Sequence, residues 1–197
     1  MHLIERFEHN GRTIDIVPDD DPIDPLNEHE GIGKFVAFHR RYKLGCPHDY
    51  RFDDYHSWEE LEAAIVKREN PVVILPVFLY DHSGLYLKVG SFHGLLPQGH
   101  AEWDSGQVGF MFISRDDAIK TYNTKRFTKQ VKEAITNALT MEIDVYSHYL
   151  NGEVYGFAIH EGDKDSDVVD ACYGFFFIDE CRNQAKEMVD ALIEQEK

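Results

Sequence analysis

The chain has 197 residues and a formal net charge of −16 at pH 7, with 36 Asp and Glu against 20 Lys and Arg. This balance argues against direct binding to nucleic acid or to an anionic membrane surface, because both contacts need clustered Lys and Arg. Hydrophobic residues make up 43% of the chain and aromatic residues 13%, which is enough for a folded core in a protein of this length.

Apolar runs bounded by Gly, Pro, Asn and Asp predict strands, whereas apolar residues at helical spacing predict helices. In chain order the predicted elements are strands 12–17 and 33–39, helix 57–70, strands 72–80, 85–89 and 107–113, helices 114–121 and 128–150, strands 153–160 and 168–178, and helix 179–194. Ser57 and Glu60 form a capping box at the start of the first helix. Two of the strand pairs are separated by short polar turns and are predicted to be hairpins.

Strands dominate the middle of the chain and helices are interleaved with them. This order predicts an α+β fold with a largely antiparallel sheet, a long central helix and a C-terminal helix packed on it. The proline-punctuated acidic stretch 18–25 has the composition of a loop. Residues 1–30 are therefore predicted to be an acidic N-terminal segment, and residues 31–197 a single α+β domain.

The three cysteines, Cys46, Cys172 and Cys181, form no Cys-x-x-Cys pair. This usage fits a reducing compartment better than a secreted disulfide framework. Residues 1–10 are charged and lack the apolar core of a signal peptide, and no stretch is long and apolar enough to cross a bilayer. We therefore expect a cytoplasmic protein.

The acidic excess is concentrated at the two ends of the chain. Residues 1–30 contain 9 acidic and 2 basic residues, and residues 151–197 contain 12 acidic and 4 basic residues. The stretch 31–150 is almost neutral, with 15 acidic and 14 basic residues. If the ends come together on one face, that face will attract a basic partner surface.

Two polar blocks at predicted strand ends, residues 80–84 and 102–107, contain groups suited to acid/base or nucleophilic chemistry. The candidate catalytic residues are Asp81, His82, Asp104 and Ser105. The same residue types also build tight turns, with Gly supplying a positive φ, and a purely structural loop is the preferred interpretation of both blocks.

A metal site would need several side chains from separate loops to meet at one sheet edge. The candidates for such a site are His39, Asp81, His82, His100 and Asp104. No His-Glu-x-x-His, His-x-His or Cys-x-x-Cys spacing places two ligands on one element, so we predict neither a metal nor a cofactor. The segment 161–167 begins like a calcium loop, but Val168 and Gly174 stand where that loop requires Gly and Glu.

The only basic cluster of the sequence is His-Arg-Arg-Tyr-Lys at residues 39–43. It could bind an anion, or it could pair with the acidic ends of the same chain. The internal pairing is the preferred interpretation, because isolated basic runs in acidic proteins often serve as counter-charge.

Five sequence blocks carry a resemblance to a known group of proteins. They are HRRYKLG at 39–45, LYDHSG at 79–84, WDSGQVGF at 103–110, GEVYGF at 152–157 and DACYGF at 170–175. With these blocks the chain resembles an uncharacterised protein family of phage and plasmid genomes. The resemblance implies a mobile-element setting and assigns no role to any residue.

The leading hypothesis is an acidic phage- or plasmid-type interaction protein without enzymatic activity. It would present a DNA-like negative surface and inhibit a host defence or nucleic-acid-binding complex, as counter-defence proteins such as anti-CRISPR proteins do. The expected partner is a basic surface of a host protein or nucleoprotein complex. The expected partner-binding residues are Asp19, Asp20, Asp21, Asp24, Asp163, Asp165, Asp167 and Asp170.

Two alternatives remain open. The first is a hydrolase or nucleic-acid-processing enzyme that uses the loops at 80–84 and 102–107, and it requires these loops to meet in one pocket. The second is that the acidic composition only keeps the protein soluble, since net charge speaks to solubility before it speaks to function.

Overall fold

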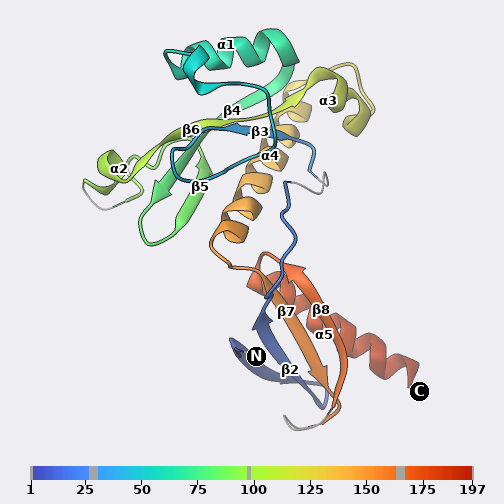
Figure 1. Ribbon diagram of the computed structural model, residues 1–197. Coiled ribbons are helices and arrows are strands. Elements are labelled where there is room, and N and C mark those ends of the chain that lie inside the picture. The colour runs from blue at the N-terminus through green and yellow to red at the C-terminus, as the bar shows by residue number, and fades with distance from the viewer. Residues whose placement is uncertain (1, 27–30, 97–98, 163–166, 197) are drawn as a thin grey trace. The chain divides into compact units, whose positions relative to one another are not determined.

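The computed structural model describes residues 2–26, 31–96, 99–162 and 167–196 (Figure 1). The chain forms two compact units. The central unit comprises residues 24–150, and the terminal unit comprises residues 1–23 together with residues 151–197. This division differs from the predicted one, which separated residues 1–30 from a single domain at 31–197, because the N-terminal strands pair with strands from the other end of the chain.

The predicted α+β class is confirmed, and the antiparallel strands form two four-stranded sheets rather than one. The sheet of the central unit has the order β3-β6-β4-β5, with every neighbouring pair antiparallel. Its strands are β3 (Lys34–Ala37), β4 (Pro71–Asp81), β5 (Leu85–Val89) and β6 (Ser105–Ser114). Its helices are the 3₁₀ turn Phe52–Asp54, α1 (Trp58–Glu69), α2 (His100–Trp103), α3 (Arg115–Tyr122) and α4 (Lys129–Leu150).

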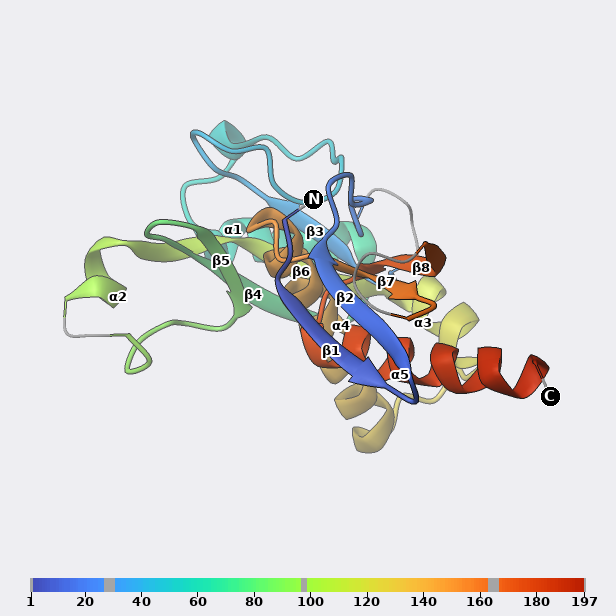
Figure 2. The same ribbon diagram turned by 90° about the horizontal axis from the view of Figure 1, so that it is seen from below.

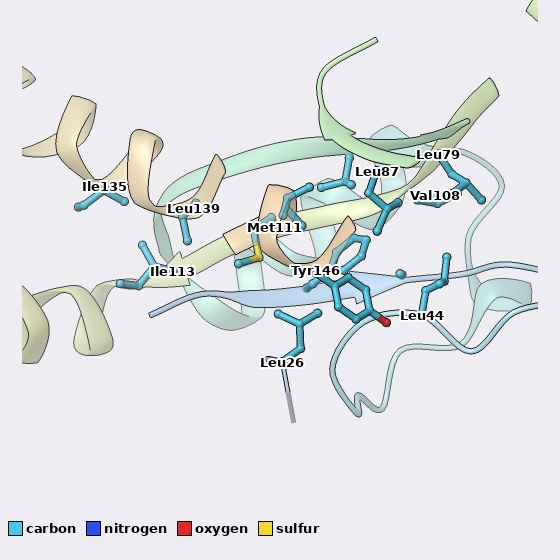
Figure 3. Close-up of a cluster of buried hydrophobic side chains, with 14 of the residues drawn as sticks. Leu26, Leu44, Leu79, Leu87, Val108, Met111, Ile113, Ile135, Leu139 and Tyr146 are labelled. Carbon is cyan, nitrogen blue, oxygen red and sulfur yellow. The ribbon is translucent and has the colours of Figure 1, made fainter. Parts of the chain in front are cut away.

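Helices cover both faces of the central sheet (Figure 1). Met111 of β6 packs with Leu139 and the other inward residues of α4, in the cluster that Figure 3 shows. Phe110 and Phe112 point to the opposite face, where they pack with Leu61 and Ile65 of α1. Successive residues of a strand face opposite sides of the sheet, and those of β6 are apolar on both. The sheet is therefore buried between α4 on one face and α1 on the other.

The ends of α1 follow directly from its sequence. The Ser57 hydroxyl accepts a hydrogen bond from the Glu60 amide, and the Glu60 carboxylate accepts one from the His56 amide. At the other end Asn70 adopts the left-handed conformation with φ 47°, and Pro71 begins β4. The predicted capping box and helix stop are therefore confirmed.

Gly109 is required by the close approach of β3 to β6. A Cβ atom at Gly109 would lie 2.0 Å from the carbonyl oxygen of Val36 and 2.8 Å from the Cα atom of Ala37. Both obstacles are backbone atoms of the paired strand, so no side-chain movement can make room. Gly106, three residues earlier on the same strand, has nothing within 4 Å of the position that a Cβ atom would take.

We predict that Gly109→Ala lowers the free energy of unfolding of the central unit by about 3 kcal/mol, because the methyl group overpacks two strands that cannot separate. Gly106→Ala is the matched control and is expected to change it by less than about 0.5 kcal/mol. Urea unfolding of the two variants measures the difference. Equal stability of the two variants would show that β3 does not approach β6 as closely at Gly109 as the structure shows.

The terminal unit is built from both ends of the chain. Its sheet has the order β1-β2-β7-β8, and β1 and β2 form a hairpin (Figure 2). The strands are β1 (Glu5–His9), β2 (Arg12–Pro18), β7 (Tyr155–His160) and β8 (Val168–Phe175), and the helix is α5 (Ile178–Gln195). One face of the sheet packs against α5, where Ile14, Phe157 and Ile159 meet Cys181, Ala185 and Val189. No described helix of either unit is long and apolar enough to cross a membrane.

Asp15 lies on the face of β2 opposite to α5, and its carboxylate forms an ion pair with Arg6. Arg6 on the neighbouring strand donates two hydrogen bonds of 2.5 Å to Asp15, and His160 Nε2 lies 3.4 Å from the same carboxylate. Asp15 is buried, yet the hydrogen bonds and charge of Arg6, with a further contribution from His160, lower its pKa below the ordinary value of 3.8.

We predict that Asp15→Asn destabilises the terminal unit by about 2 kcal/mol at neutral pH, since it removes charge-assisted hydrogen bonds from a buried position. A carboxyl group whose pKa is lowered by folding stabilises the folded state above its unfolded pKa, and this contribution is lost as the pH falls through the folded pKa. The difference between wild type and variant should therefore shrink below about pH 3.8 in unfolding measurements from about pH 3 to pH 7. A difference that is independent of pH would contradict the proposed role of the Asp15 charge.

Candidate functional site

A cluster of polar side chains lies at the end of the central sheet where β4 stops and β6 begins. The two strands are antiparallel, so the last residues of β4 lie beside the first residues of β6. The short helix α2 immediately precedes β6, with His100 as its first residue and Asp104 at its C-cap. The amide of Asp81 donates a 2.9 Å hydrogen bond to the carbonyl of Asp104 and ties the two segments together.

Two imidazoles converge on the carboxylate of Asp104. The Nδ1 atom of His82 lies 3.3 Å from Asp104 Oδ2, and the Nδ1 atom of His100 lies 3.9 Å from the same oxygen. The Tyr80 hydroxyl lies 3.2 Å from His100 Nδ1, and the Tyr80 ring stacks on His82 with 5.7 Å between ring centroids. The side chains of His82, His100 and Asp104 are 50%, 39% and 36% exposed, so solvent and small ligands can reach all three.

The hairpin loop that carries His82 is tighter than the sequence suggests. Asp81 still belongs to β4 and pairs with Leu85, which leaves His82, Ser83 and Gly84 as the loop. The positive φ of this turn, 60°, is at Ser83, whereas the sequence interpretation gave that role to Gly84. The His82 amide donates to the Gly84 carbonyl, so the loop backbone is held by a hydrogen bond of its own.

Arg41 from the basic segment 39–43 forms an ion pair with Asp81. This partner belongs to the central unit, whereas the sequence interpretation paired the basic segment with the acidic ends of the chain. Burial and the neighbouring charge of Arg41 lower the pKa of His39, so its neutral form is favoured. Arg40 and Lys43 are exposed and take part in no ion pair within the described part of the chain.

Two cavities border the basic segment 39–43, and the smaller one also borders the polar cluster. The smaller one, about 310 Å³, is bordered by Arg41, Asp81, Asp104 and Ser105. The larger one, about 980 Å³, is formed by residues 37–48 with Phe52, Trp58, Gln107 and Val108. The larger cavity therefore combines the cations of the basic segment with aromatic walls.

The predicted catalytic residues are only partly brought together. Asp81, His82 and Asp104 lie in one cluster, as the enzymatic alternative requires. The Ser105 hydroxyl donates a 2.5 Å hydrogen bond to the Ala101 carbonyl and is not paired with a histidine in the described residues. Sequence reasoning left His100 out of the catalytic set, although its spacing of four residues from Asp104 corresponds to one helical turn.

The predicted partner-binding aspartates have different environments. Asp163 and Asp165 lie outside the described residues. Asp20, Asp21 and Asp167 are exposed, whereas Asp170 is half-buried. The Asp19 carboxylate accepts a hydrogen bond from the Asp21 amide, and the Asp24 carboxylate accepts one from the Leu26 amide. These two aspartates therefore also shape turns, and Asp24 belongs to the central unit.

The strongest concentration of negative charge is in the terminal unit, which contains 18 acidic and 6 basic residues. Its three arginines are paired inside the unit: Arg6 with Asp15, Arg12 with Glu196, and Arg182 with Glu5 and Asp179. Half of the six basic residues of the unit therefore already have a carboxylate partner within it.

Helix α5 carries an acidic row that sequence reasoning did not single out. Glu180, Glu187 and Glu194 are exposed and make no ion pair among the residues that the structure describes. They are spaced seven residues apart, which is two helical turns or about 10.5 Å of rise, and so they lie along one side of the helix. The signal that could have found them is this heptad spacing of glutamates between the buried residues of the same helix.

Comparisons of the chain with protein-family models, with curated proteins and with solved structures returned no match. The function is therefore inferred from the two features above, the acidic terminal unit and the polar cluster of the central unit.

Proposed function

We propose that the protein is an acidic phage- or plasmid-type interaction protein that inhibits a host defence or nucleic-acid-binding complex. Its terminal unit would bind a basic surface of that complex in place of nucleic acid. The observation that supports this proposal is the gathering of residues 1–23 and 151–197 into one folded unit with a threefold excess of acidic over basic residues.

The negative charges of the α5 row, which are unpaired among the described residues, lie on the surface of the terminal unit. Each of the three arginines already has a carboxylate partner within the unit, while the glutamates of the α5 row face solvent. A surface with one sign of charge produces a field that steers an oppositely charged partner and accelerates its association. Such a field is also the basis on which nucleic acid attracts its binding proteins.

A surface of this kind competes for the Lys and Arg side chains that would otherwise contact phosphates. The α5 row supplies carboxylates on a rigid helix, and the exposed Asp20, Asp21 and Asp167 extend the negative charge to the loops. The three cysteines are free, which agrees with the proposed location in the reducing cytoplasm of the host.

A second candidate function is a hydrolase or nucleic-acid-processing enzyme that uses the loops at 80–84 and 102–107. One specific observation favours it: the two loops meet, through the hydrogen bond from Asp81 to Asp104 and the contact between His82 and Asp104. The two candidates depend on different units, so they can be tested separately.

We predict that the triple variant Glu180→Lys, Glu187→Lys and Glu194→Lys loses most of the binding to the host partner. Each reversal turns an attraction into a repulsion, and together they should weaken binding by at least about tenfold. The measurement is affinity capture from host lysate between about 50 mM and about 500 mM salt, with identification of the bound proteins.

The matched control reverses three exposed acidic residues of the central unit, Asp53→Lys, Asp116→Lys and Glu133→Lys. It changes the net charge by the same amount and should retain the partner. Capture that is insensitive to salt, or an equal loss in both triple variants, would argue against a binding surface on the terminal unit.

A further inference from the structure

The polar cluster of the central unit contains three side chains that can serve together as metal ligands. His82, His100 and Asp104 each offer one ligand atom, and these atoms all lie within 4.8 Å of one another. We propose that they form a binding site for a divalent transition metal ion of the Zn²⁺ class. This proposal concerns the central unit and does not depend on the function proposed for the terminal unit.

The distances between the ligand atoms fit a metal site. Two ligands of a tetrahedral Zn²⁺ ion, each about 2.0–2.1 Å from the metal, lie about 3.3 Å apart. The distance from His82 Nδ1 to Asp104 Oδ2 is 3.3 Å. The distance from His100 Nδ1 to the same oxygen is 3.9 Å, about 0.6 Å longer than this spacing, and all three ligand atoms lie within 4.8 Å of one another. Rotation of the partly exposed His100 side chain can shorten the longer distance.

Hydrogen bonding accounts for the contact of His82 with Asp104 and for that of Tyr80 with His100, but not for the approach of His100 to Asp104. Both Nδ1 atoms face the same carboxylate oxygen, and His100 Nδ1 is also 3.2 Å from the Tyr80 hydroxyl. The 3.9 Å separation is too long for a hydrogen bond between His100 and Asp104. A cation placed among the three groups would satisfy the carboxylate charge and both imidazole lone pairs at once.

The surroundings hold the ligands in position. The stacked ring of Tyr80 limits the rotation of His82, and the Asp81 amide fixes the backbone of Asp104. The Tyr80 hydroxyl is 3.2 Å from His100 Nδ1, the proposed ligand atom, so metal binding would replace this contact and leave the hydroxyl free to hydrogen-bond a metal-bound water. Such outer contacts orient the ligands of metal sites and contribute to affinity.

The donor set selects the class of metal. Two imidazoles and one carboxylate suit Zn²⁺ and neighbouring divalent transition metals, whereas Ca²⁺ and Mg²⁺ prefer oxygen ligands alone. Three protein ligands leave a coordination position for water or a small ligand, which is the arrangement of catalytic rather than structural zinc sites. All three side chains are at least about one-third exposed, and the cavity of about 310 Å³ borders Asp104, so solvent can reach the ligands.

The sequence predicts no metal because the ligands come from two separate segments. His100 and Asp104 are one helical turn apart, but His82 is supplied by a hairpin loop and joins them only when β4 pairs with β6. All three ligands are among the five metal candidates of the sequence, and the other two, His39 and Asp81, are not part of this group. No local spacing motif shows which of the five meet.

Isothermal titration calorimetry of the full chain with Zn²⁺, and Co²⁺ absorption spectra, test the proposal. One ion per chain should bind the wild type, and Co²⁺ should show the visible bands of a nitrogen- and oxygen-ligated site. His82→Gln, His100→Gln and Asp104→Asn should each weaken binding by at least about a hundredfold, since loss of an outer contact alone costs 10–100-fold. His56→Gln, a change at an exposed histidine outside the cluster, should leave affinity and stoichiometry unchanged.

X-ray absorption at the zinc edge of the wild-type complex provides a measurement that does not depend on how the variants fold. It should show nitrogen and oxygen ligands with two imidazoles in the first coordination sphere. Absence of stoichiometric binding to the wild type, a sulfur ligand in the absorption spectrum, or unchanged affinity in folded His82→Gln would each overturn the site.

Discussion

The pairing of β2 with β7 is the interaction on which the organisation of this protein depends. It joins residues Thr13–Pro18 to residues Tyr155–His160 in antiparallel register, across nearly the whole length of the chain. The pairing makes one sheet from the two ends and gives α5 an apolar face to cover. Because each end carries a large acidic excess, the same hydrogen bonds that close the sheet also concentrate negative charge in one unit.

Antiparallel pairing has a second consequence in the central unit. Because β6 runs opposite to β4, the hairpin loop after β4 meets the short helix before β6, and His82 reaches Asp104. On its other side β6 pairs with β3, which approaches it closely at Gly109. The polar cluster therefore lies at the ends of the two inner strands β4 and β6, each of which is paired on both sides, and such rigid elements are the support that a binding site needs.

Local signals in the sequence predicted the local elements well. The capping box at Ser57, the stop at Asn70 and both hairpins of the prediction have counterparts in the structure. Strand β1 was missed because it is a short edge strand with charged residues on its outer face. The two-unit organisation could not be read from the sequence, since it depends on a strand pairing over a long separation that no local pattern specifies.

The candidate sites could likewise be predicted only as far as local sequence signals reach. Asp81, His82 and Asp104 were named from their positions at strand ends, but only the fold shows that they meet and that Ser105 is engaged elsewhere. The aspartate-rich loops were predicted to bind a partner because of their composition, although two of their carboxylates accept hydrogen bonds from backbone amides within turns. The glutamates of α5 were overlooked, because spacing along a helix is less conspicuous than a run of acidic letters.

Competition with DNA tests the central claim most directly. Duplex DNA is titrated against the complex of this protein with its captured host partner, at constant ionic strength so that general screening does not change. If the terminal unit occupies the surface that binds nucleic acid, DNA and the protein must exclude each other, and the protein is released in step with DNA binding. A ternary complex, in which DNA binds the partner while this protein stays bound, would contradict the account.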